Sequence, residues 1–153
     1  MSYDLMVFEA EAAPKDHYGF LQWCAEQTTW TEGHSYDDPS VTTARLRVWF
    51  LEAIQLFPPL NGVLAERELP KDEATAADYS IGTQMIYIGF AWSKAELAYQ
   101  TTLDLAAKHG VGFFDVSSAD EEVWLPTGGR LMLAHQRGTT SLVKRVGKLF
   151  RRN

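Results

Sequence analysis

The sequence contains a single cysteine, Cys24, so no disulfide bond can form within the chain. The lack of disulfides is typical of proteins from a reducing compartment. The residues after Met1 show neither the basic start nor the apolar stretch of a secretory signal peptide. The longest apolar run, from Met85 to Trp92, has eight residues, whereas a membrane-spanning helix needs about 20. These absences predict a soluble protein of the cytoplasm.

Recognisable catalytic and metal-binding motifs are also missing. The chain has no Cys-x-x-Cys pair, and its four histidines show no ligand spacing. Cys24 falls on the apolar stripe of an expected helix, so we interpret it as a buried thiol and not as a nucleophile. His34, close to Glu32, is the best candidate for acid–base or metal chemistry, but we favour a solvated polar loop there. The sequence therefore predicts no catalytic residue, no metal site and no cofactor.

Acidic residues are absent from the end of the chain. Residues 137–153 contain six of the 14 basic residues and none of the 20 acidic ones, a net charge of +6. Residues 1–136 contain eight basic residues and all of the acidic ones, which leaves a net charge of −12. Such a separation affects partners and association rates more than it affects the fold.

Apart from this asymmetry, the composition is that of an ordinary globular protein. Of the 153 residues, 46% are hydrophobic and 22% are charged, as in a typical soluble domain. The aromatic share of 12% includes five tryptophans, which fill cores and also act as anchors at interfaces. We expect a single domain over residues 1–137, followed by a basic segment over residues 138–153.

Hydrophobic periodicity predicts an α+β fold. The expected elements are a strand at 3–8, a helix opened by Pro14, a helix from Thr42 or Thr43 to Phe57, strands at 78–81 and 85–92, a helix from Ser93 to His109, and strands at 111–116, 122–125 and 130–135. Ser93 and Glu96 fit a capping box, and Gly110 fits a left-handed cap. When the first two helices are counted as one connection, the order is β-α-β-β-α-β. We expect a ferredoxin-like sheet with its helices on one face.

The basic segment has the pattern of an amphipathic C-terminal helix. Its apolar stripe consists of Leu142, Val143, Val146, Leu149 and Phe150. The cations expected to make its contacts are Lys144, Arg145, Lys148, Arg151 and Arg152. A helix of about twelve residues is marginal alone and needs a surface. That surface could be the body of the protein, an anionic membrane, a partner protein or nucleic acid. The acidic body disfavours membrane and nucleic acid.

Two loops are candidate binding segments. The loop from Trp30 to Pro39 places aromatic side chains among acids, and its expected partner-binding residues are Trp30, Glu32, Tyr36, Asp37 and Asp38. These acids could equally serve solubility alone. The segment from Asn61 to Ala77 is polar and long for a compact domain. It is either a binding loop or a plain surface excursion.

Four segments of the sequence resemble a family of small bacterial cytoplasmic proteins. They are residues 2–9 (SYDLMVFE), 36–43 (YDDPSVTT), 57–62 (FPPLNG) and 106–116 (AAKHGVGFFDV). The basic segment lies outside this resemblance. Proteins similar to these look like immunity proteins of bacterial toxin systems, which implies a non-enzymatic role. The resemblance supplies no catalytic residues.

Three functions follow as hypotheses. The first is an immunity protein that occludes the active site of a basic toxin domain, with the acidic body accelerating capture. The second is a small enzyme or ligand-binding domain, with a pocket between the sheet and residues 61–77 and with His34, Asp37 and Asp38 as acid–base groups. The third is a peripheral membrane adaptor that uses the basic segment.

Overall fold

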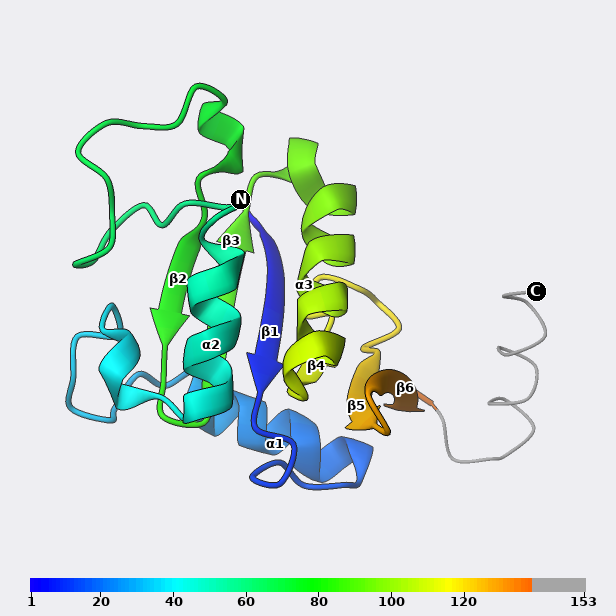
Figure 1. The fold of residues 1–153 in the computed structure, drawn as a ribbon. Helices are drawn as coiled ribbons and strands as arrows, with labels where there is room; N and C mark the ends of the chain where they lie inside the picture. Colours follow the sequence, from blue (N-terminus) through cyan, green and yellow to red (C-terminus); the bar gives the residue numbers. More distant parts are fainter. Residues whose placement is uncertain (139–153) are drawn as a thin grey trace.

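The computed structural model describes residues 1–138, which form three α-helices and a six-stranded antiparallel sheet (Figure 1). The fold class is therefore α+β, as predicted. The strand order in the sheet is β2-β3-β1-β4-β5-β6. The elements are β1 (Tyr3–Phe8), α1 (His17–Gln27), α2 (Ala44–Ala53), β2 (Asp78–Ile81), β3 (Met85–Phe90), α3 (Ala95–His109), β4 (Gly112–Phe114), β5 (Val123–Thr127) and β6 (Arg130–His135).

Strand β1 lies in the interior of the sheet, as its apolar sequence predicts. It pairs antiparallel with β3 on one side, where Leu5 faces Ile88, and with β4 on the other, where Met6 faces Phe114. Residues 5–8 are all at most 1% exposed. Both faces of this strand must therefore be covered by other elements.

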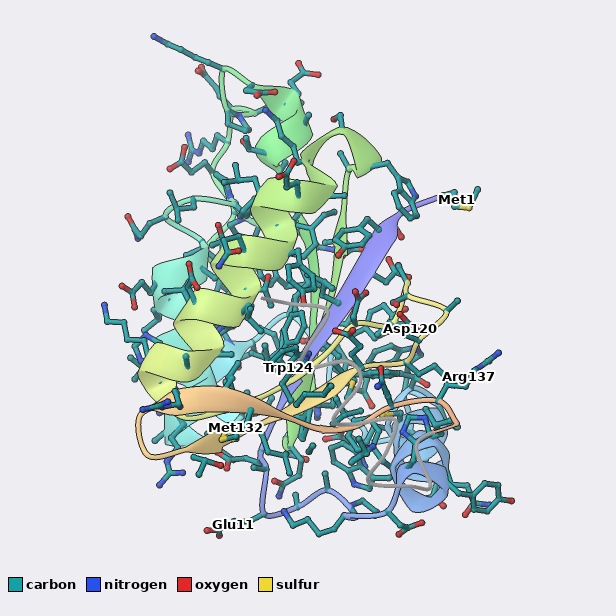
Figure 2. All side chains as sticks on the ribbon, turned by 90° about the vertical axis from the view of Figure 1, so that its right-hand side faces the viewer. Met1, Glu11, Asp120, Trp124, Met132 and Arg137 are labelled. Atoms are coloured by element: carbon teal, nitrogen blue, oxygen red, sulfur yellow. The ribbon has the colours of Figure 1, made fainter. Side chains whose placement is uncertain are left out.

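The alternation of β1 side chains divides the core into two clusters. Leu5 and Val7 belong to the cluster that α2 and α3 cover, whereas Met6 and Phe8 pack with Phe20 of α1. Figure 2 shows the consequence, with α2 and α3 on one side of β1 and α1 on the other. The prediction that the helices share one face is therefore wrong for α1, because Met6 and Phe8 create a second apolar face that needs a cover.

Side-chain caps set the starts of α1 and α2. Asp16 accepts a hydrogen bond from the Gly19 N–H at 2.7 Å, so α1 begins at His17 and not at Pro14. Thr43 caps α2 as predicted, by accepting from the Leu46 N–H. The regular part of α2 ends at Ala53, before the expected end at Phe57.

The start of α3 differs from the prediction. A short 3₁₀ turn at Trp92–Lys94 comes first, so the helix begins at Ala95 with Lys94 as its N-cap. Lys94 makes no side-chain capping bond, and the predicted capping box of Ser93 and Glu96 is wrong. The C-terminal prediction is confirmed, because Gly110 adopts the left-handed conformation with φ of 68°.

Two other predicted segments have different outcomes. Residues 61–77 contain a 3₁₀ turn at Glu73–Thr75, and a bridge between Pro59 and Ala77 closes the segment. The amphipathic helix predicted over residues 138–153 lies, apart from Gly138, outside the described residues, as do its cations Lys144, Arg145, Lys148, Arg151 and Arg152. None of the helices within residues 1–138 has the length and hydropathy of a membrane span.

The contact between Gly112 and Phe8 gives a stability prediction. The two residues are paired across β1 and β4, and a Cβ at position 112 would lie 2.3 and 2.4 Å from Phe8 ring carbons. Gly112→Ala should therefore lower the free energy of unfolding by about 1–3 kcal/mol, the usual cost of overpacking. Urea unfolding measures this cost.

A double-mutant cycle with Phe8→Leu tests the cause. The shorter side chain should relieve the clash, so Gly112→Ala should cost less in the Phe8→Leu background than in the wild type. Strictly additive costs would show that the Phe8 ring is not what excludes a side chain at position 112.

Candidate functional site

The loop from Trp30 to Asp38 has an unusual backbone. Trp30 and Tyr36 have φ of 57° and 64°, in the left-handed region that residues other than glycine rarely occupy. The Ile81 N–H donates to the Tyr36 carbonyl at 2.7 Å, and the Glu32 N–H donates to the Tyr36 hydroxyl at 2.7 Å. Such conformations persist only where surrounding contacts impose them. The loop is therefore tied to β2 in one conformation.

Glu32 fastens this loop to the β2–β3 hairpin. Its Oε1 accepts from the Thr83 N–H at 2.9 Å and from the Thr83 hydroxyl at 2.7 Å, and His34 Nε2 lies 3.2 Å away. Burial raises the pKa of Glu32, but the hydrogen bonds from Thr83 and His34 outweigh it and hold the pKa below its usual value. The partner-binding role of Glu32 stays a prediction, and the structure shows an anchoring role.

The two aspartates also make local bonds. Asp37 accepts from the Ser35 hydroxyl. Asp38 caps the turn at Pro39–Val41 by accepting from the Ser40 N–H at 2.8 Å, a bond that lowers the pKa of Asp38. His34 uses both ring nitrogens, since its Nδ1 faces the Tyr36 N–H at 3.2 Å and its Nε2 faces Glu32. These side chains shape the loop through bonds to their near neighbours in the chain.

Trp30 is the predicted residue that combines exposure with a neighbouring hollow. Its ring meets Tyr36 at 5.1 Å and Tyr87 at 6.1 Å between ring centroids, both edge-on, an orientation that aromatic pairs favour. Trp30 is 40% exposed. Packing on two sides therefore fixes a large side chain that still reaches solvent.

A pocket of about 350 Å³ lies beside Trp30, on the face of the sheet that α1 covers in part. Its lining consists of Met6, Cys24, Ala25, Thr28, Trp30, Tyr87, Phe114 and Val116. Phe20 of α1 packs on Phe8 and covers it, but the helix ends at Gln27. The pocket exists because the sheet beyond this end is left uncovered. Burial raises the pKa of the Cys24 thiol to about 12, which leaves it protonated and unsuited to nucleophilic chemistry.

Asp4 adds a charge at the end of Tyr87. The Tyr87 hydroxyl donates to Asp4 Oδ2 at 2.7 Å. Burial, this bond and the Asp4 charge raise the pKa of Tyr87 above its usual value, so Tyr87 remains the donor. Gly89 faces Asp4 across the strand pair, and a Cβ there would lie 3.5 Å from Asp4 Oδ1. Among residues 1–138, Asp4 has no ion-pair partner.

Asp4, Tyr87 and the pocket were not among the predicted site residues. The lining comes from β1, α1, β3 and the end of β4, which are far apart in the chain. The sequence of β1 does indicate where Asp4 lies. Asp4 and Met6 are two positions apart in the strand, so their side chains face the same side of the sheet. This spacing predicts a carboxylate next to the apolar surface that Met6 forms.

A second group of titratable side chains lies between α1 and the β5–β6 edge. Arg137 Nε contacts Glu121 Oε1 at 2.7 Å, and His17 Nδ1 lies 2.7 Å from His135 Nδ1. Figure 2 labels Asp120 near Arg137, whose N–H donates to the Asp120 carbonyl. In the part of the chain that the structure describes, no group of three or more His, Cys, Asp or Glu residues could hold a metal ion.

Asp115 and its neighbour Glu122 are buried carboxylates. Burial and the neighbouring Glu122 charge raise the pKa of Asp115 to about 6, and its Oδ1 has no hydrogen-bond partner among the described residues. Asp115 is absent from the lining of the pocket beside Trp30.

Comparison with known proteins adds no assignment: no protein-family model matches the chain, and no curated protein or solved structure matches it significantly.

The anchoring role of Glu32 gives a pH-dependent prediction. Glu32→Ala should lower the free energy of unfolding by about 1–3 kcal/mol at neutral pH, because it removes hydrogen bonds to a charged acceptor. The folded-state pKa of Glu32 is lowered. The stabilisation is therefore present above the unfolded pKa of about 4.3 and is lost as pH falls through the folded value. Urea unfolding across this range should show the two proteins converging in stability.

Glu26→Ala is the matched control, since Glu26 is an exposed acid on α1. It should change stability by less than about 0.5 kcal/mol at every pH. A Glu32→Ala effect as small as this control, or one that grows as pH falls, would contradict the anchoring role.

Proposed function

We propose that this chain is a non-enzymatic binding protein that captures a basic partner protein. In its most specific form, the proposal is an immunity protein that occludes the active site of a bacterial toxin in the cytoplasm. The observation that supports it best is Trp30, a partly exposed aromatic side chain fixed by a strained backbone and two ring contacts. Interfaces are commonly anchored by rigid aromatic residues of this kind.

The charge of the body supports a basic partner. Residues 1–136 carry a net charge of −12, and complementary fields raise association rates by about 10- to 1000-fold. Fast capture suits a protein that must neutralise a toxin before the toxin acts. Many intracellular toxins act on nucleic acids and carry basic surfaces. An acidic protein that binds over such a surface is complementary to it in charge.

The sheet supports a finer assignment of the fold. Strands β1 to β4 lie in the order β2-β3-β1-β4, and each neighbouring pair is antiparallel. We infer from this order a ferredoxin-like arrangement, in which β5 and β6 extend the sheet beyond β4. The displaced α1 departs from the usual placement of both helices on one face.

The enzyme hypothesis has weaker support. It needs His34, Asp37 and Asp38 to face a common cavity, but each of these side chains makes a local bond within the loop. The pocket beside Trp30 is lined by none of the three. A preformed binding surface accounts for the same loop without a reaction.

Affinity capture tests the proposal. The tagged chain should recover one partner in stoichiometric amount from its bacterial host, and high ionic strength should weaken the complex because screening reduces charge attraction. Trp30→Ala should weaken the complex about tenfold or more, as expected for an anchor residue. Trp92→Ala is the matched control, because Trp92 is similarly exposed at 52% and precedes α3.

Toxicity of the captured partner tests the immunity role itself. The partner should arrest growth when it is expressed alone, and co-expression of this chain should restore growth. Recovery of no stoichiometric partner, or of a partner that leaves growth unchanged, would contradict the immunity proposal.

A further inference from the structure

The pocket beside Trp30 combines three features that point to one kind of occupant. Its walls are apolar and aromatic, and Trp30 is its partly exposed edge. The Asp4 carboxylate is not itself part of the lining, but it accepts the hydrogen bond of the lining residue Tyr87 and has no cationic partner among residues 1–138. Its volume of about 350 Å³ is at the lower end for small-molecule sites, and is large enough for one long side chain.

We propose that this pocket binds an arginine side chain of the partner protein, with the guanidinium on Asp4. This inference rests on the proposed function, because it names the residue type through which a basic partner is recognised. The arginine stem lies against Met6 and Phe114, and its planar head lies beside the Trp30 and Tyr87 rings. An arginine stem favours apolar surface while its head remains polar.

Asp4 is held in position to receive this head. The Tyr87 hydroxyl donates to Oδ2, and the Ser2 hydroxyl donates to Oδ1. Each carboxylate oxygen has a second lone-pair site, so two acceptor sites remain for the fork of a guanidinium. A Cβ at Gly89 would lie 3.3 Å from the Ser2 hydroxyl and 3.5 Å from Asp4 Oδ1, so the missing side chain makes room for the Ser2–Asp4 pair. The two bonds therefore orient Asp4 without neutralising its charge.

The aromatic walls favour arginine over lysine. Arginine stacks on aromatic rings and pairs with carboxylates through two parallel bonds, whereas lysine presents a compact and strongly hydrated charge. Trp30 and Tyr87 lie edge-on to each other, with 6.1 Å between centroids, so a planar group at their junction meets the face of one ring.

NMR titration with Nα-acetyl-arginine amide tests the pocket without the partner. The arginine amide should shift the Trp30 indole N–H and the backbone signals of Asp4 and Tyr87. Nα-acetyl-citrulline amide has nearly the same shape without the charge, and should shift these signals about tenfold more weakly. Nα-acetyl-lysine amide should also bind more weakly than the arginine compound. Equal binding of the citrulline compound, tighter binding of the lysine compound, or shifts confined to other surfaces would overturn the inference.

Two variants test whether the Asp4 charge itself is what binds the arginine amide. Asp4→Asn keeps an acceptor for Tyr87 and should reduce arginine-amide affinity about tenfold, with its unfolding curve as the check on folding. Asp104→Asn is the matched control, since Asp104 is an exposed acid on α3, and it should leave the affinity unchanged. An equal loss in both variants would show general attraction to an acidic protein and would overturn the specific site.

The captured partner distinguishes this inference from the proposed function. If the partner binds but Asp4→Asn leaves its affinity unchanged, the arginine pocket is wrong while the binding function stands. If the arginine amide binds at Asp4 but the host yields no partner, the proposed function is wrong while the site stands.

Discussion

Burial of strand β1 on both faces is the constraint on which the rest of the structure depends. Because β1 lies between β3 and β4, its alternating side chains define two apolar surfaces, one carrying Leu5 and the other carrying Met6 and Phe8. Helices α2 and α3 cover the first surface, and α1 must cover the second. The two-sided architecture follows from this one strand, and the candidate site lies on the side that a single helix covers.

Incomplete cover by α1 links the fold to the proposed function. The helix ends at Gln27, and the chain then turns through Trp30, whose ring lies beside the part of the sheet that α1 leaves open. Glu32 fastens this turn to the β2–β3 hairpin, so the aromatic edge of the pocket is preformed. A preformed surface loses less conformational freedom on binding, which is one source of affinity in small interfaces.

Local features of the fold could be predicted from the sequence, and features that depend on distant segments could not. The hairpin strands, the Thr43 cap and the Gly110 cap follow from residue patterns within a few positions. The failed capping box at Ser93 and the side of the sheet that α1 occupies depend on how neighbouring turns and faces pack. The candidate site likewise has one part that could be predicted and one part that could not. Trp30 could be selected as an exposed aromatic residue, whereas the Tyr87–Asp4 pair requires the β1–β3 register.

In the proposed complex, the basic protein binds at the open part of the α1 face and not at the α2–α3 face. Hydrogen–deuterium exchange of the chain with and without its captured partner tests this claim most directly. We expect slower exchange in residues 28–36 and in β3 on complex formation, with α2 and α3 unchanged. Protection confined to α2 and α3, with unchanged exchange around Trp30 and Tyr87, would contradict it.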